Sequence, residues 1–451
     1  MAHGAWGVDV RSLGPRQRVF ELNAGKLMMP ASNMKIVTVA TSADALGWES
    51  RVTTTLEAVG PIEGGVLRGD LIVRGAGDPT INARNARAST VFDEWAAALK
   101  AAGIREITGR IVGDDQAFDD EGLGSGWAWD YLQYAYAAPS GALQYNEDAA
   151  DLTIDPGAAP GDPVVVALAA GAGLTVLNRA KTTDAGTPEA ITYRRHLDRP
   201  VLEIAGSLPA GSVRLTRSVS VVNPTVFFAH SLKDALISRG IAVPGEAVDL
   251  DDVAASMGST GSGARQVLAT TPSPPLREIA TVLMKVSQNL YAETLLKTLG
   301  SARHGLGTFE GGRRAVNATL AAWGIPEDGH VIADGSGLSR YNYVSAGMLA
   351  TILEHVYDDQ RLRSDFMATL PIAGRDGTLA SRMKRTRAEG NALAKTGAIA
   401  NVRAVSGYVR TRDGETLVFS ILANDFVIPA ATVNWIADLA IETLANFSRR
   451  H

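Results

Sequence analysis

A serine and a lysine that could perform acyl transfer stand three residues apart in the stretch SNMK, as Ser32 and Lys35. Apolar residues recur at helical spacing from Pro30 to Gly47, so the pattern predicts that Ser32 lies at the start of a helix. Residues three apart share one helix face, which brings the amine within reach of the hydroxyl. A nearby amine can activate a serine hydroxyl as its base, and the N–H groups of the first helical turn favour developing negative charge.

The same spacing recurs at Ser381 and Lys384, inside the basic stretch SRMKRTR. A run of like charges is typical of a solvated surface segment. We therefore expect Ser381 to have no catalytic role, and either pair taken alone is equally compatible with a structural role.

A second candidate motif is Ser287-Gln288-Asn289, the only S-x-N in the chain. It lies between the helical patterns LREIATVLMKV and LYAETLLKTLG, which predicts a tight connection between two helices. A hydroxyl that relays a proton and an amide that binds a substrate carbonyl would both serve acyl transfer. The alternative is an ordinary capping turn.

A third candidate is Lys395-Thr396-Gly397, at the start of a predicted strand. Glycine permits close approach of a substrate backbone, threonine offers a hydroxyl to a carboxylate, and lysine offers positive charge. The alternative is a strand edge of no chemical consequence.

Taken together and in this order, the motifs S-x-x-K, S-x-N and K-T-G are the set found in penicillin-binding proteins and serine β-lactamases. The chain resembles the class C low-molecular-mass penicillin-binding proteins, the D-alanyl-D-alanine carboxypeptidase/endopeptidase family. The resemblance extends over most of the chain, in the stretches MPASNMK, GDLIVRGAGDPT, MKVSQNLYAETLLK, DGSGLSRYNYVS and AKTGAIANVRAVSGYV. A long insertion between the first two motifs is a further feature of this group.

The expected fold is α+β, a penicillin-binding-protein/serine β-lactamase-like transpeptidase domain with an antiparallel sheet and helices, carrying an inserted β-rich region of one or two domains. Alternating apolar residues predict a hairpin near the start and three strands near the end, LAKTGAI, VRAVSGYVRT and TLVFSILAN, before a last helix. Because strands are predicted at both ends of the chain, we expect the first hairpin and the last three strands to form one sheet. We expect a catalytic domain of residues 1–50 and 223–451, an inserted domain of 51–80 and 145–222, and a nested domain of 81–144.

The resemblance implies a role for each motif residue. Ser32 would be the acylated nucleophile and Lys35 its proton acceptor. Ser287 and Lys395 would relay a proton to the departing D-alanine, while Asn289 holds the peptide carbonyl.

The same resemblance implies a substrate-binding strand, with the backbone N–H groups of Ser32 and Ala398 as the oxyanion hole. Thr396 and Gly397 would lie beside the substrate, and Thr396 would contact its terminal carboxylate. The family usually has threonine where this chain has Ala398, so one hydroxyl for that carboxylate is missing. Arg403 on the next predicted strand would compensate, or it is an ordinary solvated arginine.

Residues outside the motifs suggest a pocket for the stem-peptide side chain. The stretch GWAWDYLQY carries Trp127, Trp129 and Asp130, where aromatic rings and a carboxylate would suit a free amine. Arg340 in DGSGLSR would meet a carboxylate on the same side chain. For the two tryptophans, packing in a small β-rich core is the alternative.

Composition narrows the partners. Among 451 residues the net charge is −5, cysteine is absent, and seven histidines show no metal-ligand spacing. We therefore expect no metal, no cofactor and no nucleic-acid partner, and no apolar run reaches transmembrane length. The implied partners are peptidoglycan stem peptides and β-lactam antibiotics, and the oligomeric state stays open. We expect an exported protein of the periplasm or cell envelope, whose signal peptide is absent from this sequence.

Three functions remain open at this point. The leading one is a serine D-alanyl-D-alanine carboxypeptidase/endopeptidase that β-lactams inhibit covalently. A β-lactamase or esterase with the same motifs is the second, and a catalytically weak penicillin-binding protein is the third. The insertion favours the first over the second.

Overall fold

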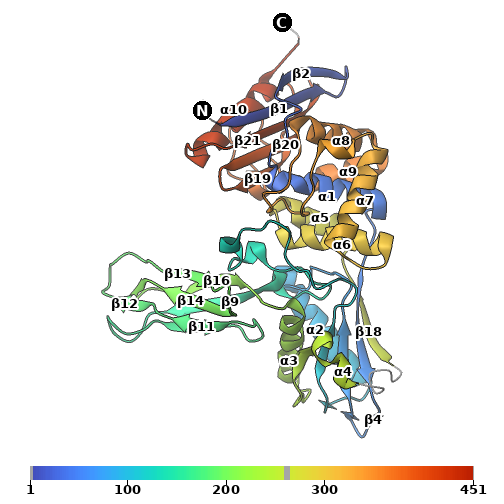
Figure 1. The fold of residues 1–451 in the computed structure, drawn as a ribbon, viewed down its shortest axis with the longest axis vertical. Coiled ribbons are helices and arrows are strands. Elements are labelled where there is room, and N and C mark those ends of the chain that lie inside the picture. The colour runs from blue at the N-terminus through green and yellow to red at the C-terminus, as the bar shows by residue number, and fades with distance from the viewer. Residues whose placement is uncertain (1–3, 258–264, 450–451) are drawn as a thin grey trace. The chain divides into compact units, whose positions relative to one another are not determined.

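The computed structural model describes residues 4–257 and 265–449 and divides the chain into two compact units (Figure 1). The first unit comprises Met1–Arg51, Gly124–Trp127 and Pro274–His451. The second comprises Val52–Leu123 and Ala128–Ser273.

The first unit is built on a five-stranded antiparallel sheet (Figure 1). Its strand order is β19 (Leu393–Ile399), β20 (Val402–Arg410), β21 (Thr416–Asn424), β1 (Ala5–Ser12) and β2 (Gln17–Leu22). Strand β1 pairs with β21 from Ala5 opposite Asn424 to Ser12 opposite Leu417. The prediction of one sheet assembled from both ends of the chain is confirmed.

Helices cover both faces of this sheet. The helices are α1 (Met34–Leu46), α5 (Leu276–Lys285), α6 (Asn289–His304), α7 (Phe309–Ala322), α8 (Ala346–Asp358), α9 (Gln360–Thr369) and α10 (Ala430–Asn446). Successive strand residues point to opposite faces, so Ala404 and Tyr408 pack into the core with α1 and α5 to α9, while Val405 and Val409 pack with α10. Helix α1 is buried at every position from Met34 to Ala43, which fixes it within the helical layer.

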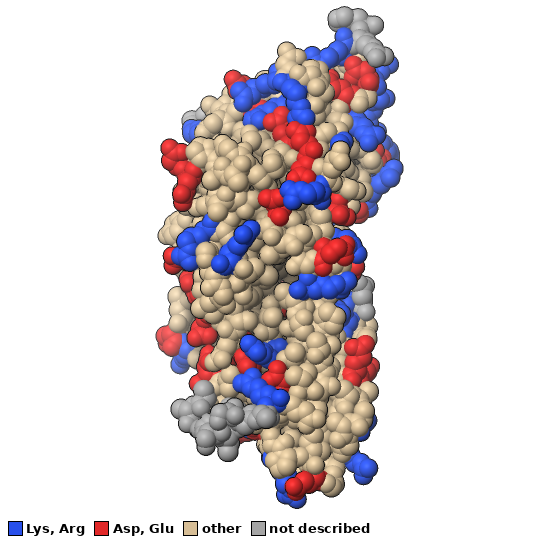
Figure 2. All heavy atoms as spheres, turned by 90° about the vertical axis from the view of Figure 1, so that its right-hand side faces the viewer, with Lys and Arg blue, Asp and Glu red and all other residues tan. Residues whose placement is uncertain are grey.

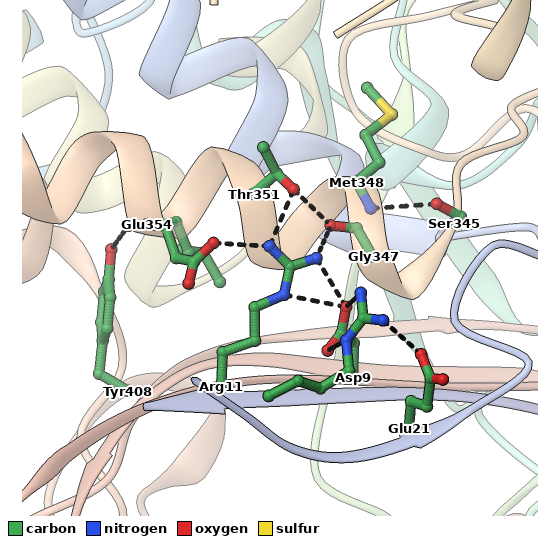
Figure 3. Close-up of polar contacts among 11 residues, drawn as sticks. Asp9, Arg11, Glu21, Ser345, Gly347, Met348, Thr351, Glu354 and Tyr408 are labelled. Carbon is green, nitrogen blue, oxygen red and sulfur yellow. Dashed lines mark hydrogen bonds and ion pairs between the residues drawn. The ribbon is translucent and has the colours of Figure 1, made fainter. Parts of the chain in front are cut away.

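A polar cluster ties the first strand to helix α8. Figure 3 shows the Arg11 guanidinium between the Asp9 and Glu354 carboxylates, at 2.7 and 2.6 Å. The same guanidinium donates to the Thr351 hydroxyl at 3.1 Å and to the Gly347 carbonyl at 3.0 Å. Asp9 is fully buried, and removing one partner of a buried ion pair is strongly destabilising, so this cluster fixes β1 against α8.

Among its described residues, the second unit contains two large hydrophobic cores and one smaller buried cluster. The first lies on a mixed sheet of β17 (Ala247–Asp249), β8 (Ile111–Asp114), β6 (Asp70–Arg74), β3 (Thr53–Val59) and β18 (Gln266–Pro272). It is shared by α2 (Arg87–Ala101) and α3 (Pro224–Ser238), and α4 (Leu250–Met257) follows β17. A small sheet of β4 (Ile62–Glu63), β5 (Val66–Leu67) and β7 (Glu106–Ile107) lies beside it.

Short strands build the second core, between residues 149 and 221. They form three sheets: β10 (Val165–Leu168), β9 (Ala149–Asp155) and β16 (Leu215–Ser220); β11 (Thr175–Asn178), β14 (Val201–Ala205) and β13 (Thr192–Arg195); and β12 (Lys181–Thr183) with β15 (Ser207–Pro209). This segment is the nested, all-β part of the unit.

The domain boundaries differ from those expected. Residues 223–273, expected with 1–50 and 274–451, belong to the second unit because Phe228 and Leu232 of α3 pack with Leu71 of β6. Residues 81–123 and 128–144, expected as part of a nested domain, lie in the same unit, and Trp95 and Ile111 belong to its first core. Residues 52–80 and 145–222, expected as one inserted domain, do share this unit, although buried residues between 150 and 221 form a core of their own.

Charges of both signs are interspersed on the face of the molecule drawn in Figure 2. Among the ion pairs of the first unit is that of Arg382 with Asp438, at 2.6 Å. Within the described ranges, no helix combines the length and the apolar character needed to cross a membrane.

Candidate active site

Ser32 lies in a 3₁₀ turn, Ala31–Asn33, that leads directly into α1. The turn is closed by the Asn33 N–H, which donates to the Pro30 carbonyl at 3.1 Å. Ala31 has a φ of +46°, in the left-handed region that costs a non-glycine residue energy. The Ser32 side chain is only partly buried, so the hydroxyl is both fixed and accessible.

Lys35 is fully buried, and its Nζ is surrounded by three oxygen acceptors. Nζ lies 2.9 Å from Oγ of Ser32, 2.6 Å from Oδ1 of Asn289 and 2.8 Å from the carbonyl of Ser336. Burial lowers the pKa of Lys35 to about 7, against the opposing effect of the Glu293 and Asp334 charges. A substantial neutral fraction is therefore present near neutral pH, as a general base requires.

Ser287 lies between α5 and α6 with a φ of +63°, a second strained position in the site. Its Oγ accepts a hydrogen bond from Nζ of Lys395 at 2.9 Å, and that Nζ also donates to the Thr396 carbonyl at 2.7 Å. Burial lowers the pKa of Lys395 well below its usual range, and the charge of Lys35 lowers it further. The site thus contains two lysines, each bonded to a serine hydroxyl.

Strand β19 lies directly against the turn that carries Ser32. A Cβ atom on Gly397 would lie 2.6 Å from the Pro30 carbonyl and 3.0 Å from the Ser32 nitrogen, so only glycine fits. Because β19 is at the edge of its sheet, alternate backbone groups along it point away from β20. The adjacent Ala398 is exposed. The backbone N–H groups of Ser32 and of this edge strand are thus neighbours.

Two buried carboxylates that the sequence analysis did not single out hold the loop around Ser336. Glu293 of α6 accepts the N–H groups of Gly335 and Ser336 at 2.9 and 2.8 Å. Burial raises the pKa of Glu293, and these two donors oppose the shift. The Ser336 carbonyl is thereby fixed where it accepts from Lys35. The one available sequence signal was that Glu293 follows the S-x-N motif on the same helix.

Asp334 is the second of these carboxylates and is also fully buried. It accepts the backbone N–H groups of Gly337 and Ser339 at 2.7 and 2.6 Å and the side-chain amide of Asn342 at 2.7 Å. The indole N–H of Trp127 also donates to it, at 2.9 Å. Trp127 is thus a structural partner of the loop, whichever ligand its ring meets.

Three other predicted binding residues of the first unit, Thr396, Arg403 and Arg340, each donate hydrogen bonds to carbonyl or hydroxyl groups of the protein. Thr396 donates from its hydroxyl to the Thr378 hydroxyl at 2.7 Å. Arg403 donates to the carbonyls of Ile399 and Val402 at 2.9 and 2.7 Å. Arg340 donates to the Ala400 carbonyl at 3.1 Å, at the turn between β19 and β20.

Residues outside this cluster fall into two groups. Asp130 belongs to the second unit, in the short turn Trp129–Tyr131, where Trp129 is 65% exposed. Ser381 and Lys384 are both exposed and lie outside any helix, which agrees with the expectation of a solvated basic stretch.

Among the described residues, one group of carboxylates is close enough together to share a cation. Ligand oxygens of Asp115, Asp249 and Asp251, in the second unit, lie within 4.8 Å of one another. Burial raises the pKa of Asp115 to about 6, with a smaller contribution from the neighbouring acids. Protonation relieves the repulsion between such groups without any ion.

The fold and the site together define a serine peptidase of the penicillin-binding class. Residues 1–443 match the D-Ala-D-Ala carboxypeptidase 3 (S13) family. The chain belongs to this family and is a serine-type D-Ala-D-Ala carboxypeptidase, as its motifs predicted.

Individual relatives agree with this assignment. A D-alanyl-D-alanine carboxypeptidase of Actinomadura sp. (strain R39) is 35% identical over 94% of this chain and 78% of its own length. The carboxypeptidase DacB of Haemophilus influenzae is 27% identical over 93% of this chain and 85% of its own. The crystal structure of penicillin binding protein 4 (dacB) from the same organism superposes with a TM-score of 0.82 at 26% identity, covering 99% of this chain and 98% of that one. The predicted fold class is confirmed.

Proposed function

We propose that this carboxypeptidase removes the terminal D-alanine from peptidoglycan stem peptides through an acyl-enzyme on Ser32. The observation that carries the proposal is the hydrogen bond of 2.9 Å between Lys35 Nζ and Ser32 Oγ, in a buried setting that lowers the lysine pKa to about 7. A serine hydroxyl needs such a base to become a nucleophile.

In the acylation step, Ser32 Oγ forms a bond to the carbonyl carbon of the penultimate D-alanine while neutral Lys35 takes the hydroxyl proton. The negative charge on the carbonyl oxygen is met by the N–H groups of Ser32 and Ala398. The C–N bond then breaks, and the proton taken up by Lys35 passes by way of Ser287 and Lys395 to the leaving amine, which leaves Lys35 neutral again. Asn289 would hold the peptide carbonyl beside the nucleophile.

In deacylation, water replaces the departed D-alanine. Lys35 again accepts a proton, this time from water, whose oxygen attacks the ester carbon. The ester bond to Ser32 breaks, and the proton returns to its oxygen. A β-lactam would follow the first step only, because its ring opens without releasing an amine fragment that water could replace. Covalent inhibition follows.

Binding of the stem-peptide side chain forms the finer part of the proposal. Asp130 would pair with a free amine at the end of that side chain, Arg340 with a carboxylate, and Trp127 would line the pocket. Support comes from Arg340, whose guanidinium lies at the end of the substrate-binding strand through its bond to Ala400. An exported location in the periplasm or cell envelope is part of the same proposal, because the cell wall that contains these stem peptides lies outside the cytoplasmic membrane.

The proposal is tested with the whole chain and two reagents. Intact-mass spectrometry after benzylpenicillin should show one adduct, mapped to the peptide that contains Ser32. Release of D-alanine from a D-Ala-D-Ala peptide should accompany it and disappear in Ser32→Ala, with Ser381→Ala as the matched control. Rapid penicillin hydrolysis without D-alanine release would favour the β-lactamase alternative. An adduct without any turnover would favour a weak penicillin-binding protein.

A further inference from the structure

Strand β19 lacks one of the two hydroxyl groups expected to bind the terminal carboxylate of the substrate. Thr396 supplies one hydroxyl, but Ala398 has only a methyl group where a second hydroxyl would lie on the same strand. Arg403 is directly opposite Ala398 in the ladder, yet its guanidinium donates to the carbonyls of Ile399 and Val402, at 2.9 and 2.7 Å. The strands β19 and β20 therefore supply only one side-chain donor for the carboxylate, and a second donor must come from another part of the unit.

A hydroxyl from outside the sheet lies beside the hydroxyl of Thr396. Thr378 is the middle residue of a short turn, Gly377–Leu379, that packs against β19. Its Oγ1 accepts a hydrogen bond from Oγ1 of Thr396 at 2.7 Å, and both side chains are partly exposed. When two hydroxyls are this close, each can turn its proton toward a carboxylate bound in front of them, one to each carboxylate oxygen.

The turn that carries Thr378 is fixed to the helix that leads into Ser287. Lys285, the last residue of α5, pairs with the Asp376 carboxylate at 2.7 Å and donates to the Leu370 carbonyl at 2.7 Å. The other oxygen of Asp376 accepts the Ile372 N–H at 2.8 Å. Donors held in place before the substrate arrives bind it with a smaller entropic cost.

Gly377 shows how closely the turn is held. Its φ is +55°, and a Cβ atom on it would lie 2.6 Å from the Lys285 carbonyl. A larger residue would push the turn away from α5, and Thr378 with it.

We propose that Thr378 is a substrate-binding residue that pairs with Thr396 to bind the terminal carboxylate, in place of the hydroxyl that Ala398 lacks. This inference rests on the proposed function, since it concerns the carboxylate of the same D-Ala-D-Ala substrate. It assigns the residue that determines preference for a free carboxylate over a neutral end group.

The test compares a charged and a neutral acylating agent, benzylpenicillin and its methyl ester. Thr378→Val removes the hydroxyl with little change in shape, Thr378→Ser keeps it, and Thr443→Val removes an exposed hydroxyl on α10 as the matched control. We expect Thr378→Val to lower the acylation rate constant for benzylpenicillin, and kcat/KM for a D-Ala-D-Ala peptide, by roughly ten- to a hundredfold. The methyl ester should change by less than about threefold, because an ester accepts such bonds weakly.

A compensating variant distinguishes carboxylate binding from support of the turn. Ala398→Thr in the Thr378→Val background should recover part of the loss for benzylpenicillin and leave the methyl ester unchanged. Equal losses on both reagents, or wild-type rates in Thr378→Val, would overturn the inference while leaving the proposed function intact. Failure of the wild-type chain to acylate at Ser32 or to release D-alanine would instead overturn the proposed function itself.

Discussion

The Nζ atom of Lys35 lies 2.6 Å from Oδ1 of Asn289, although 254 residues separate the two in the chain. This bond joins the first motif directly to the second. A base whose position depends on residues of another helix, α6, and of the loop around Ser336 is sensitive to each of them, and its charge state responds to the carboxylates nearby.

The first prediction concerns the pH dependence of acylation. Because Lys35 must be neutral to accept the Ser32 proton, the rate should rise with pH through about 7, its pKa in the folded enzyme. Lys35→Ala should slow acylation by roughly 10²-fold or more, since a positioned base contributes about 10² to 10⁴. Stopped-flow measurements with a fluorescent penicillin from pH 5.5 to 8.5 would check both. Lys384→Ala is the control, and a flat profile would show that Lys35 is structural.

The second prediction separates proton transfer from charge at Lys395. Its lowered pKa leaves it able to lose a proton, whereas an arginine stays protonated under all assay conditions. We expect Lys395→Arg and Ser287→Ala to lower kcat for D-alanine release by about 10²-fold. Circular dichroism would verify that both variants fold. Near wild-type turnover in Lys395→Arg would mean that the residue supplies only positive charge.

The third prediction is for Glu293→Gln. A glutamine amide can accept only one of the two N–H groups of Gly335 and Ser336 and turns its own NH₂ toward the other, which should cost about 1–3 kcal/mol of stability. Burial raises the pKa of Glu293 to about 8, and its ionised form raises the pKa of Lys35, so the substitution removes that influence as the pH approaches 8. The rising limb of the acylation profile should therefore move to lower pH. A shift to higher pH would contradict the electrostatic role assigned to Glu293.

The fourth prediction tests the stem side-chain pocket. Asp130→Ala and Arg340→Ala should each lower kcat/KM by roughly ten- to a hundredfold for a peptide with a charged side-chain end, the loss of one charge-assisted hydrogen bond. Benzylpenicillin, which lacks that end, should hardly change, and acetylation of the side-chain amine should cancel the effect of Asp130→Ala. If the rates fall equally for the charged peptide, the acetylated peptide and benzylpenicillin, the two residues support the fold and do not bind the side chain.

The fifth prediction concerns stability of the second unit. The folded-state pKa of Asp115 is raised to about 6, so the folded chain binds a proton more tightly than the unfolded chain does. The stability that this tighter proton binding adds to the free energy of unfolding is fully present below pH about 4 and is lost as the pH rises to about 6. Asp115→Asn should remove that loss and raise the free energy of unfolding at pH 7 by roughly 2 kcal/mol or less. Urea titrations at pH 4 and pH 7 would measure it, and an unchanged pH dependence would refute the assignment.

Local patterns predicted the elements of the first unit well. The predicted strand LAKTGAI has the bounds of β19, and the predicted connection at Ser287 separates α5 from α6. Both follow from strong short-range signals, namely period-two alternation and a polar break between amphipathic helices. The left-handed conformations of Ala31 and Ser287 had no such signal, because tertiary contacts impose them.

The sequence did not reveal which core each helix joins. The apolar stripe of α3 fits either unit, and only the contact of Phe228 with the core of β3 and β6 assigns it to the second. Thr378 was missed for a related reason. A threonine that follows a glycine in a turn has no sequence signal for substrate binding. It becomes a candidate only because folding brings its hydroxyl to 2.7 Å from the hydroxyl of Thr396. Pairings between distant segments carry no periodic signature.

The ladder between β1 and β21 also determines when the enzyme can become active during synthesis. Strand β1 leaves the ribosome long before its partner β21, which pairs with it from Leu417 to Asn424. Until then β1 has only its hairpin with β2, and a lone hairpin is marginally stable in water. Closing so long a loop is slow. The nascent chain therefore carries Ser32 without Lys395 until strand β19 has emerged, so a chain that is released before that point has the nucleophile but lacks the strand that completes its site.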